Sequence, residues 1–238
     1  MNNSIKIGAI ALTAMALGAC GSSDSDDDEI VLQDAEFEVR VINLTQAQPI
    51  SPVAIMLHNS GFNSFIDGET ASPALELLAE GGDNSDILGE VQAASQHVDS
   101  ASTAGAVMPF TSSATVSLTV PASELNDLRL STIGMLILTN DAFTGTNASN
   151  ISGMSVGDSI SINGPTWDSG TESNTETAAS IPGLAGEGFN VARDDIIDRV
   201  RFHQGVVTSA SSDFGLASSS LNETHRFLNP SSRIVVTR

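Results

Sequence analysis

Apolar and polar residues alternate along several short segments of the chain, a pattern typical of β-strands that are buried on one face. The first alternation places Phe37, Val39 and Val41 on one face, with Glu38 and Arg40 between them. The same alternation, or a short continuous apolar run, predicts further strands over 53–57, 116–120, 130–138, 200–203 and 234–236. Many short strands separated by turns indicate a sheet protein without an alternating helix pattern.

One part of the chain changes to helical spacing. Ser72 can cap a helix and Pro73 fits its first position, with Leu75 on the apolar face and Gly81-Gly82 as a stop. A second apolar stripe at helical spacing follows over 87–94 and reads as core. The pattern therefore predicts a short helical insertion between strands.

Residues 142–158 are rich in Gly, Ser and Asn and lack a clear period, so we expect a loop there. The remaining pattern predicts one domain over 34–238, an all-β antiparallel sandwich with the helical insertion.

The charge and the cysteine count of the chain exclude some classes of ligand. The 238 residues include 9 Lys and Arg against 29 Asp and Glu, for a formal net charge of −20. So acidic a surface repels a phosphate backbone, which excludes nucleic acid as a partner and leaves divalent cations as plausible ligands. The single Cys rules out an intrachain disulfide and a Cys-based zinc site.

The N-terminal segment has the features of an export signal. An apolar run over 7–17 follows Lys6 and ends in Leu17-Gly18-Ala19-Cys20, an aliphatic residue and two small residues before the Cys. This is the pattern of a bacterial lipoprotein, and it predicts a signal peptide over 1–19 and lipidation of Cys20. The alternative is an ordinary secretory signal with an incidental Cys.

Residues 20–33 then form an acidic tether on the lipidated Cys. We expect the chain to be anchored in the bacterial cell envelope through the lipid. Gly21 after the Cys favours the outer membrane, because an Asp there would signal the inner one.

Two acidic turns are the candidate metal site. Asp141 follows the long apolar strand, and Asp168 and Glu172 flank the glycine of Trp167-Asp168-Ser169-Gly170-Thr171-Glu172. Calcium binds six to eight oxygens from carboxylates and carbonyls on turning backbone, which such loops supply. The alternative is that Asp and Gly stand here only because turns favour them.

A hydrolase motif needs separate consideration. Gly153-Met154-Ser155-Val156-Gly157 matches the spelling of a nucleophile elbow, and Asp168 and His203 follow in the order of a triad. An elbow requires a buried strand before the Ser and a helix after it, and polar loop residues surround Ser155 instead. The four histidines also lack metal-binding spacing.

Several segments in order resemble the spondin amino-terminal domain family, most closely its bacterial lipoprotein members. They are the opening strand from Phe37, the turn at 48–52, the helical segment 71–82, the segment 167–172 and the closing residues from Phe227. The segment 167–172 resembles the family's W-D-A-G-T-D/E motif and is the most specific of them.

The resemblance implies a sandwich similar to C2 domains with a bound calcium ion, held by Asp168 and Glu172 and by Asp141. Glu172 stands where vertebrate members have Asp.

These observations predict a lipid-anchored envelope protein whose calcium-binding sandwich acts as a binding or adhesion module. Its partners would be the membrane, through the anchor, and an extracellular or envelope protein or a glycan. One alternative is a metal-assisted hydrolase that uses the same acidic site. The absence of a neighbouring His base favours the binding module, and a purely architectural envelope protein is a third reading.

Overall fold

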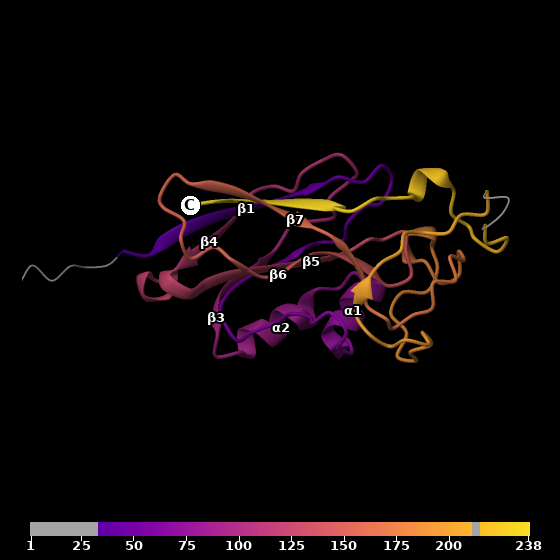
Figure 1. The fold of residues 1–238 in the computed structure, drawn as a ribbon, viewed down its shortest axis with the longest axis horizontal. Helices are drawn as coiled ribbons and strands as arrows, with labels where there is room; N and C mark the ends of the chain where they lie inside the picture. The colour runs from indigo at the N-terminus through magenta and orange to yellow at the C-terminus, as the bar shows by residue number, and fades with distance from the viewer. Residues whose placement is uncertain (1–32, 211–214) are drawn as a thin grey trace, which may run out of the picture. The chain divides into compact units, whose positions relative to one another are not determined.

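The alternating segments form two antiparallel sheets that pack face to face (Figure 1). The computed structural model describes residues 33–210 and 215–238, so the signal peptide, Cys20 and all of the tether except residue 33 lie outside the described residues. The four-stranded sheet has the order β4 (Val116–Val120), β1 (Ala35–Asn43), β10 (Ser232–Thr237) and β7 (Ser159–Gly164). The six-stranded sheet has the order β3 (His97–Ser102), β2 (Ala54–Asn59), β5 (Leu128–Met135), β6 (Ala142–Asn150), β8 (Thr166–Asp168) and β9 (Arg201–Phe202).

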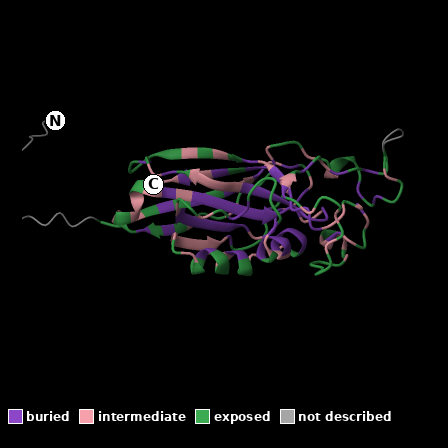
Figure 2. Cartoon of the chain, turned by 60° about the horizontal axis from the view of Figure 1, so that its bottom comes forward, coloured by how far each residue is buried: buried purple, intermediate pink, exposed green. Residues whose placement is uncertain are grey.

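The main core lies between the two sheets. Phe37, Val39 and Val41 point into it from β1, while Glu38 and Arg40 are exposed, as the alternation predicts. The central strands of the six-stranded sheet are buried along most of their length (Figure 2). They have a second apolar layer on their other face, which explains why β2 and β5 are buried almost continuously and do not alternate between buried and exposed residues.

Two helices, α1 (Pro73–Gly81) and α2 (Ser85–Ala93), supply that second layer. The Ser72 side chain accepts a hydrogen bond from the Leu75 amide at 3.2 Å, and Gly82 ends α1 in the left-handed conformation at φ 71°. Leu75 and Ile87 pack with Phe143 against the outer face of the six-stranded sheet. The helical insertion is therefore where the sequence places it. Three short 3₁₀ helices lie at Ala122–Asp127, Pro182–Leu184 and Glu223–His225.

The expectation of a loop over 142–158 is wrong for its first half, because residues 142–150 are strand β6, between β5 and β8. The small polar residues of β6 show no alternation of apolar and polar positions. Backbone hydrogen bonds to β5 on one side and to β8 on the other hold it in the sheet. Gly145 is needed there: at φ 156°, a Cβ on it would lie 1.7 Å from the Thr132 carbonyl oxygen. Strands β3, β7 and β8 were also not evident from the pattern.

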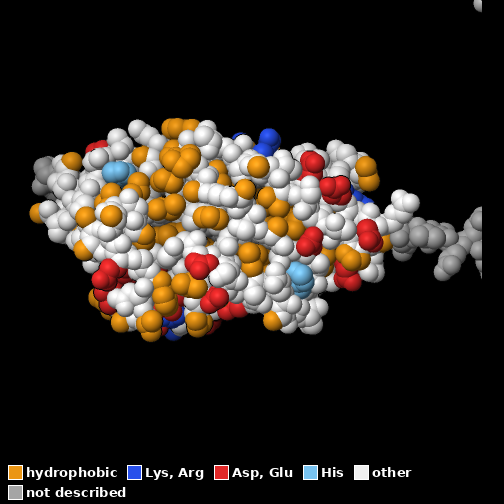
Figure 3. All heavy atoms as spheres, turned by 180° about the vertical axis from the view of Figure 1, so that it is seen from behind, with side chains coloured by type: hydrophobic (Ala, Val, Ile, Leu, Met, Phe, Trp, Pro, Cys, Tyr) orange, Lys and Arg blue, Asp and Glu red, His pale blue; other side chains and the backbone are white. Residues whose placement is uncertain are grey.

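Long irregular segments, mainly residues 169–200, 203–210 and 215–231, gather at one end of the sandwich (Figure 1). A small apolar cluster of Ile181, Val206 and Leu221 holds these segments together. The face opposite to that of Figure 1 has hydrophobic side chains across its middle and more acidic than basic side chains (Figure 3). Within 33–210 and 215–238, no helix has the length and apolar character to cross a membrane.

Candidate metal centre

Asp141 lies fully buried in the turn from β5 to β6. Its Oδ2 atom accepts three hydrogen bonds from the segment that follows β8: from the Ser169 hydroxyl at 2.8 Å, the Thr171 amide at 2.9 Å and the Glu172 amide at 3.2 Å. One carboxylate oxygen therefore holds the loop of the Trp167–Glu172 motif against the end of β6. The sequence motif and the Asp141 turn, about 30 residues apart, form one structure.

Asp168 is the last residue of β8 and pairs with Ala142 across the sheet. Its Oδ1 atom accepts from the Gly170 amide at 2.9 Å, and its Oδ2 atom accepts from the Asn174 side chain at 2.8 Å and from Arg201 at 3.0 Å. Gly170 has φ 75°, and a Cβ on it would lie 2.4 Å from the Arg199 amide nitrogen. Only glycine fits the turn of the motif.

The second oxygen of Asp141 has no hydrogen-bond partner among the described residues. Oδ1 is buried and no described group reaches it, although a buried carboxylate oxygen needs a hydrogen bond or a cation. Burial first, and the neighbouring Asp168 charge second, raise the pKa of Asp141 to about 7. Without a cation, this carboxyl group is thus partly protonated at neutral pH.

The carboxyl groups of Glu80, Glu172 and Glu176 are also close enough to Asp141 to be affected by its charge. Burial raises the pKa of Glu172 and of Glu176 to about 7, and it also raises the pKa of Glu80 on α1. The Asp141 charge adds to the shift in all three cases. Glu176 repeats the feature of Asp141: its Oε1 atom accepts from the Val207 amide at 3.1 Å, and its buried Oε2 atom has no partner among the described residues.

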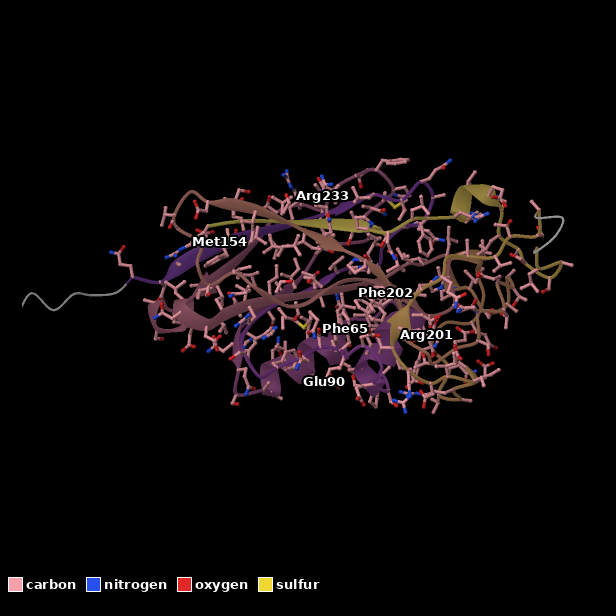
Figure 4. All side chains as sticks on the ribbon, viewed as in Figure 1. Phe65, Glu90, Met154, Arg201, Phe202 and Arg233 are labelled. Atoms are coloured by element: carbon pink, nitrogen blue, oxygen red, sulfur yellow. The ribbon has the colours of Figure 1, made fainter. Side chains whose placement is uncertain are left out.

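A single guanidinium partly compensates these charges. Arg201 pairs with Asp168 at 3.0 Å and with Asp195 at 2.6 Å (Figure 4 labels it beside β9). Burial also raises the pKa of Asp168. Of these five carboxyl groups with raised pKa values, only Asp168 forms an ion pair with an arginine among the described residues, so the site is short of positive charge. A divalent cation is the simplest group that would satisfy it.

Two cavities are lined by acidic residues of this region. One of about 150 Å³ is lined by Asp168, Glu176, Arg201 and His203, and one of about 530 Å³ is lined by Glu172 together with Glu187 and Asp194. His203 is held neutral, because burial lowers its pKa to about 4. Its Nδ1 atom accepts from the Gly205 amide at 2.9 Å, so the proton is on Nε2.

The structure thus brings Asp141 and Asp168 together and joins the Glu172 backbone to Asp141, while the Glu172 side chain lines the other cavity. In the described part of the chain, no three His, Cys, Asp or Glu side chains converge as a ready ligand set. Calcium completes its shell with backbone carbonyls and water, so two or three carboxylates suffice. The predicted calcium ligands Asp141, Asp168 and Glu172 stay a prediction.

Sequence reasoning missed Glu80, Glu176 and Arg201. Glu176 has a local signal, since it follows Glu172 by four residues in the same acidic loop. Glu80 has no local signal in the sequence. Helix α1 is far from Asp141 along the chain, and only the packing of the helix on the sheet brings Glu80 close to Asp141. The structure also separates Ser155 from Asp168: they lie beyond opposite ends of β6, a strand about 27 Å long, with no helix after Ser155. A triad of Ser155, Asp168 and His203 is excluded.

The two packed antiparallel sheets with acidic loops at one end define an all-β sandwich. The family model described as Spondin_N matches residues 44–183, more than half of the chain, and the chain belongs to this family. The match includes Asp141 and the whole Trp167–Glu172 motif, and the family is a non-catalytic, binding-type domain. A search of curated proteins found no match.

Proposed function

We propose that the chain is a calcium-stabilised binding module of the bacterial cell envelope, anchored by a lipid on Cys20. The family supports a binding module, and the Leu17–Cys20 sequence supports the anchor. One observation carries the calcium proposal: the fully buried Asp141, close to the Asp168 charge, has an oxygen with no partner in the described part of the chain.

Asp141 and Asp168 would hold the ion, with Glu172 or Glu176 from the loop that follows β8. The ion supplies positive charge where carboxylates repel one another, and it links the turn at Asp141 to the loop 168–176. Both effects act on the folded state alone, because the unfolded chain does not hold these groups together. The expected role of calcium is therefore structural: it makes the loop end of the sandwich rigid enough to present a surface.

Thermal unfolding of the EDTA-treated chain with and without calcium tests this proposal. An ion at a hundredfold excess over its dissociation constant stabilises the folded state by about 2.7 kcal/mol. For a domain of this size that corresponds to a rise in Tm of roughly 5–10 °C. Magnesium should act more weakly because it requires a tighter octahedral shell.

Asp168→Asn should remove most of the calcium effect, whereas Asp34→Asn, an exposed carboxylate at the start of the sandwich, should retain it. If sodium chloride at matched ionic strength reproduces the rise in Tm, or Asp168→Asn leaves it intact, the ion is not bound here. We do not propose hydrolysis at this site, because its carboxylates are buried and Ser155 is remote.

A further inference from the structure

A pocket on the helix-covered side of the six-stranded sheet has no role in the calcium site. It encloses about 410 Å³ between the segments 63–67, 145–147 and 165–167, within the range of small-molecule sites. Trp167 lines it, and the preceding and following residues of β8 point to the other face of the sheet. Trp167 and Asp168 thus serve two separate sites from adjacent positions.

Aromatic rings form one wall. Phe65 packs against Trp167 with the ring centroids 5.1 Å apart, and Phe202 stacks on one face of the indole at 4.2 Å and 20°. Figure 4 labels Phe65 and Phe202 close together beside β9. Phe202 is 55% exposed, an unusual state for a stacked aromatic residue that serves only the core. Phe202 does not line the pocket itself, but it adds exposed aromatic surface beside Trp167.

Hydrogen bonds hold the polar part of the lining in place. A β-bulge between β5 and β6 turns Asn147 towards the loop after β2. Its Oδ1 atom accepts from the Ser64 amide at 3.0 Å, and its Nδ2 atom donates to Asn63 Oδ1 at 3.0 Å and to the Phe65 carbonyl at 2.7 Å. The Asn147 side-chain amide thus fixes residues 63–65, which lie at the polar rim of the pocket. The pocket is therefore formed without a bound ligand.

The rim defines the chemistry of the ligand. Asn63 Nδ2 and the Asp67 carboxylate are exposed and have no hydrogen-bond partner within 33–210 and 215–238. No basic side chain of the described residues lines the pocket, and the chain is strongly acidic, so an anion would be repelled.

A flat aromatic wall beside one amide donor and one carboxylate acceptor matches a neutral sugar ring, which has an apolar C–H face and a rim of hydroxyls. We propose that this pocket binds a neutral pyranose of an envelope or extracellular glycan. The inference rests on the proposed role as a binding module and names its ligand class.

The intrinsic fluorescence of the chain reports on this pocket, because Trp167 is its only Trp and the chain has no Tyr. Oligosaccharides of glucose, galactose, mannose and N-acetylglucosamine, each at millimolar concentration, should be titrated while Trp emission is recorded in calcium. At least one should change the emission saturably. Asn63→Ala and Asp67→Ala should each weaken the binding of that sugar at least about fivefold, which corresponds to the loss of one net hydrogen bond.

Asn163→Ala removes an exposed amide from β7 in the other sheet and should leave the affinity unchanged. If none of the four oligosaccharides changes the emission, or the two rim variants bind as tightly as the original chain, the inference is wrong. The calcium proposal is judged separately by Tm. Sugar binding without a calcium effect on Tm would overturn the calcium proposal alone, and the reverse result would overturn the sugar site alone.

Discussion

Without calcium, the folded chain should become less stable as the pH rises from 6.5 to 8. The carboxyl group of Asp141 titrates near pH 7 in the folded state and near its ordinary value of 3.8 when unfolded. Between these values the folded state binds a proton that the unfolded state does not. The free energy of unfolding therefore falls as the pH rises, and this contribution is completely lost above the folded pKa.

The size of the effect follows from the same pKa. A group with a folded pKa of about 7 loses about 0.8 kcal/mol of stability between pH 6.5 and pH 8. Glu172 and Glu176, whose pKa values burial also raises to about 7, act in the same direction, with Glu172 contributing less because it remains partly solvated. We expect a total decrease of about 1–2 kcal/mol. The buried His203 acts in the opposite sense, because its lowered pKa makes the free energy of unfolding rise with pH. This effect is largest below pH 6.5, and between pH 6.5 and 8 it offsets only about 0.4 kcal/mol.

Urea unfolding in EDTA, followed by Trp167 emission at several pH values, measures this slope. Calcium should flatten it, because a bound cation keeps the carboxylates ionised. Asp141→Asn should stabilise the metal-free chain at pH 8 by about 1–3 kcal/mol, since removing a buried charge outweighs one unpartnered amide. A metal-free stability that is flat or rises from pH 6.5 to 8, or a large loss of stability in Asp141→Asn, would refute the reasoning.

Two further changes probe the anchor and the turn of the motif. Cys20→Ser should abolish both the labelling with palmitate and the partitioning of the protein into the detergent phase. Equal labelling of both chains would rule out the lipoprotein. Gly170→Ala should lower the free energy of unfolding by about 2–4 kcal/mol, because it combines a strained φ with a clash against the Arg199 backbone. Gly157→Ala is the matched control: it has a similar φ of 90° but open space around its Cβ, so its urea midpoint should shift by clearly less.

The class of fold was predictable because it rests on local rules. The alternation at Phe37, Val39 and Val41 decides which face of β1 is buried, and Ser72 with Pro73 decides where α1 begins. The family motif at 167–172 also located the acidic turn, since its glycine and carboxylate are needed by the turn itself. These features depend on neighbours within a few residues, so a single sequence is sufficient to find them.

Strand β6 and the acidic cluster depend on contacts that no local pattern records. The small polar residues of β6 become a strand because β5 and β8 pair with them, and a close backbone approach requires Gly145. Glu80 meets Asp141 only because α1 packs across the sheet, and burial then gives their carboxyl groups raised pKa values. The sequence alone determined the sandwich, its helical insertion and the acidic motif. The tertiary structure decided which carboxylates are buried and close enough to raise one another's pKa, because desolvation and repulsion depend on distance in space and not along the chain.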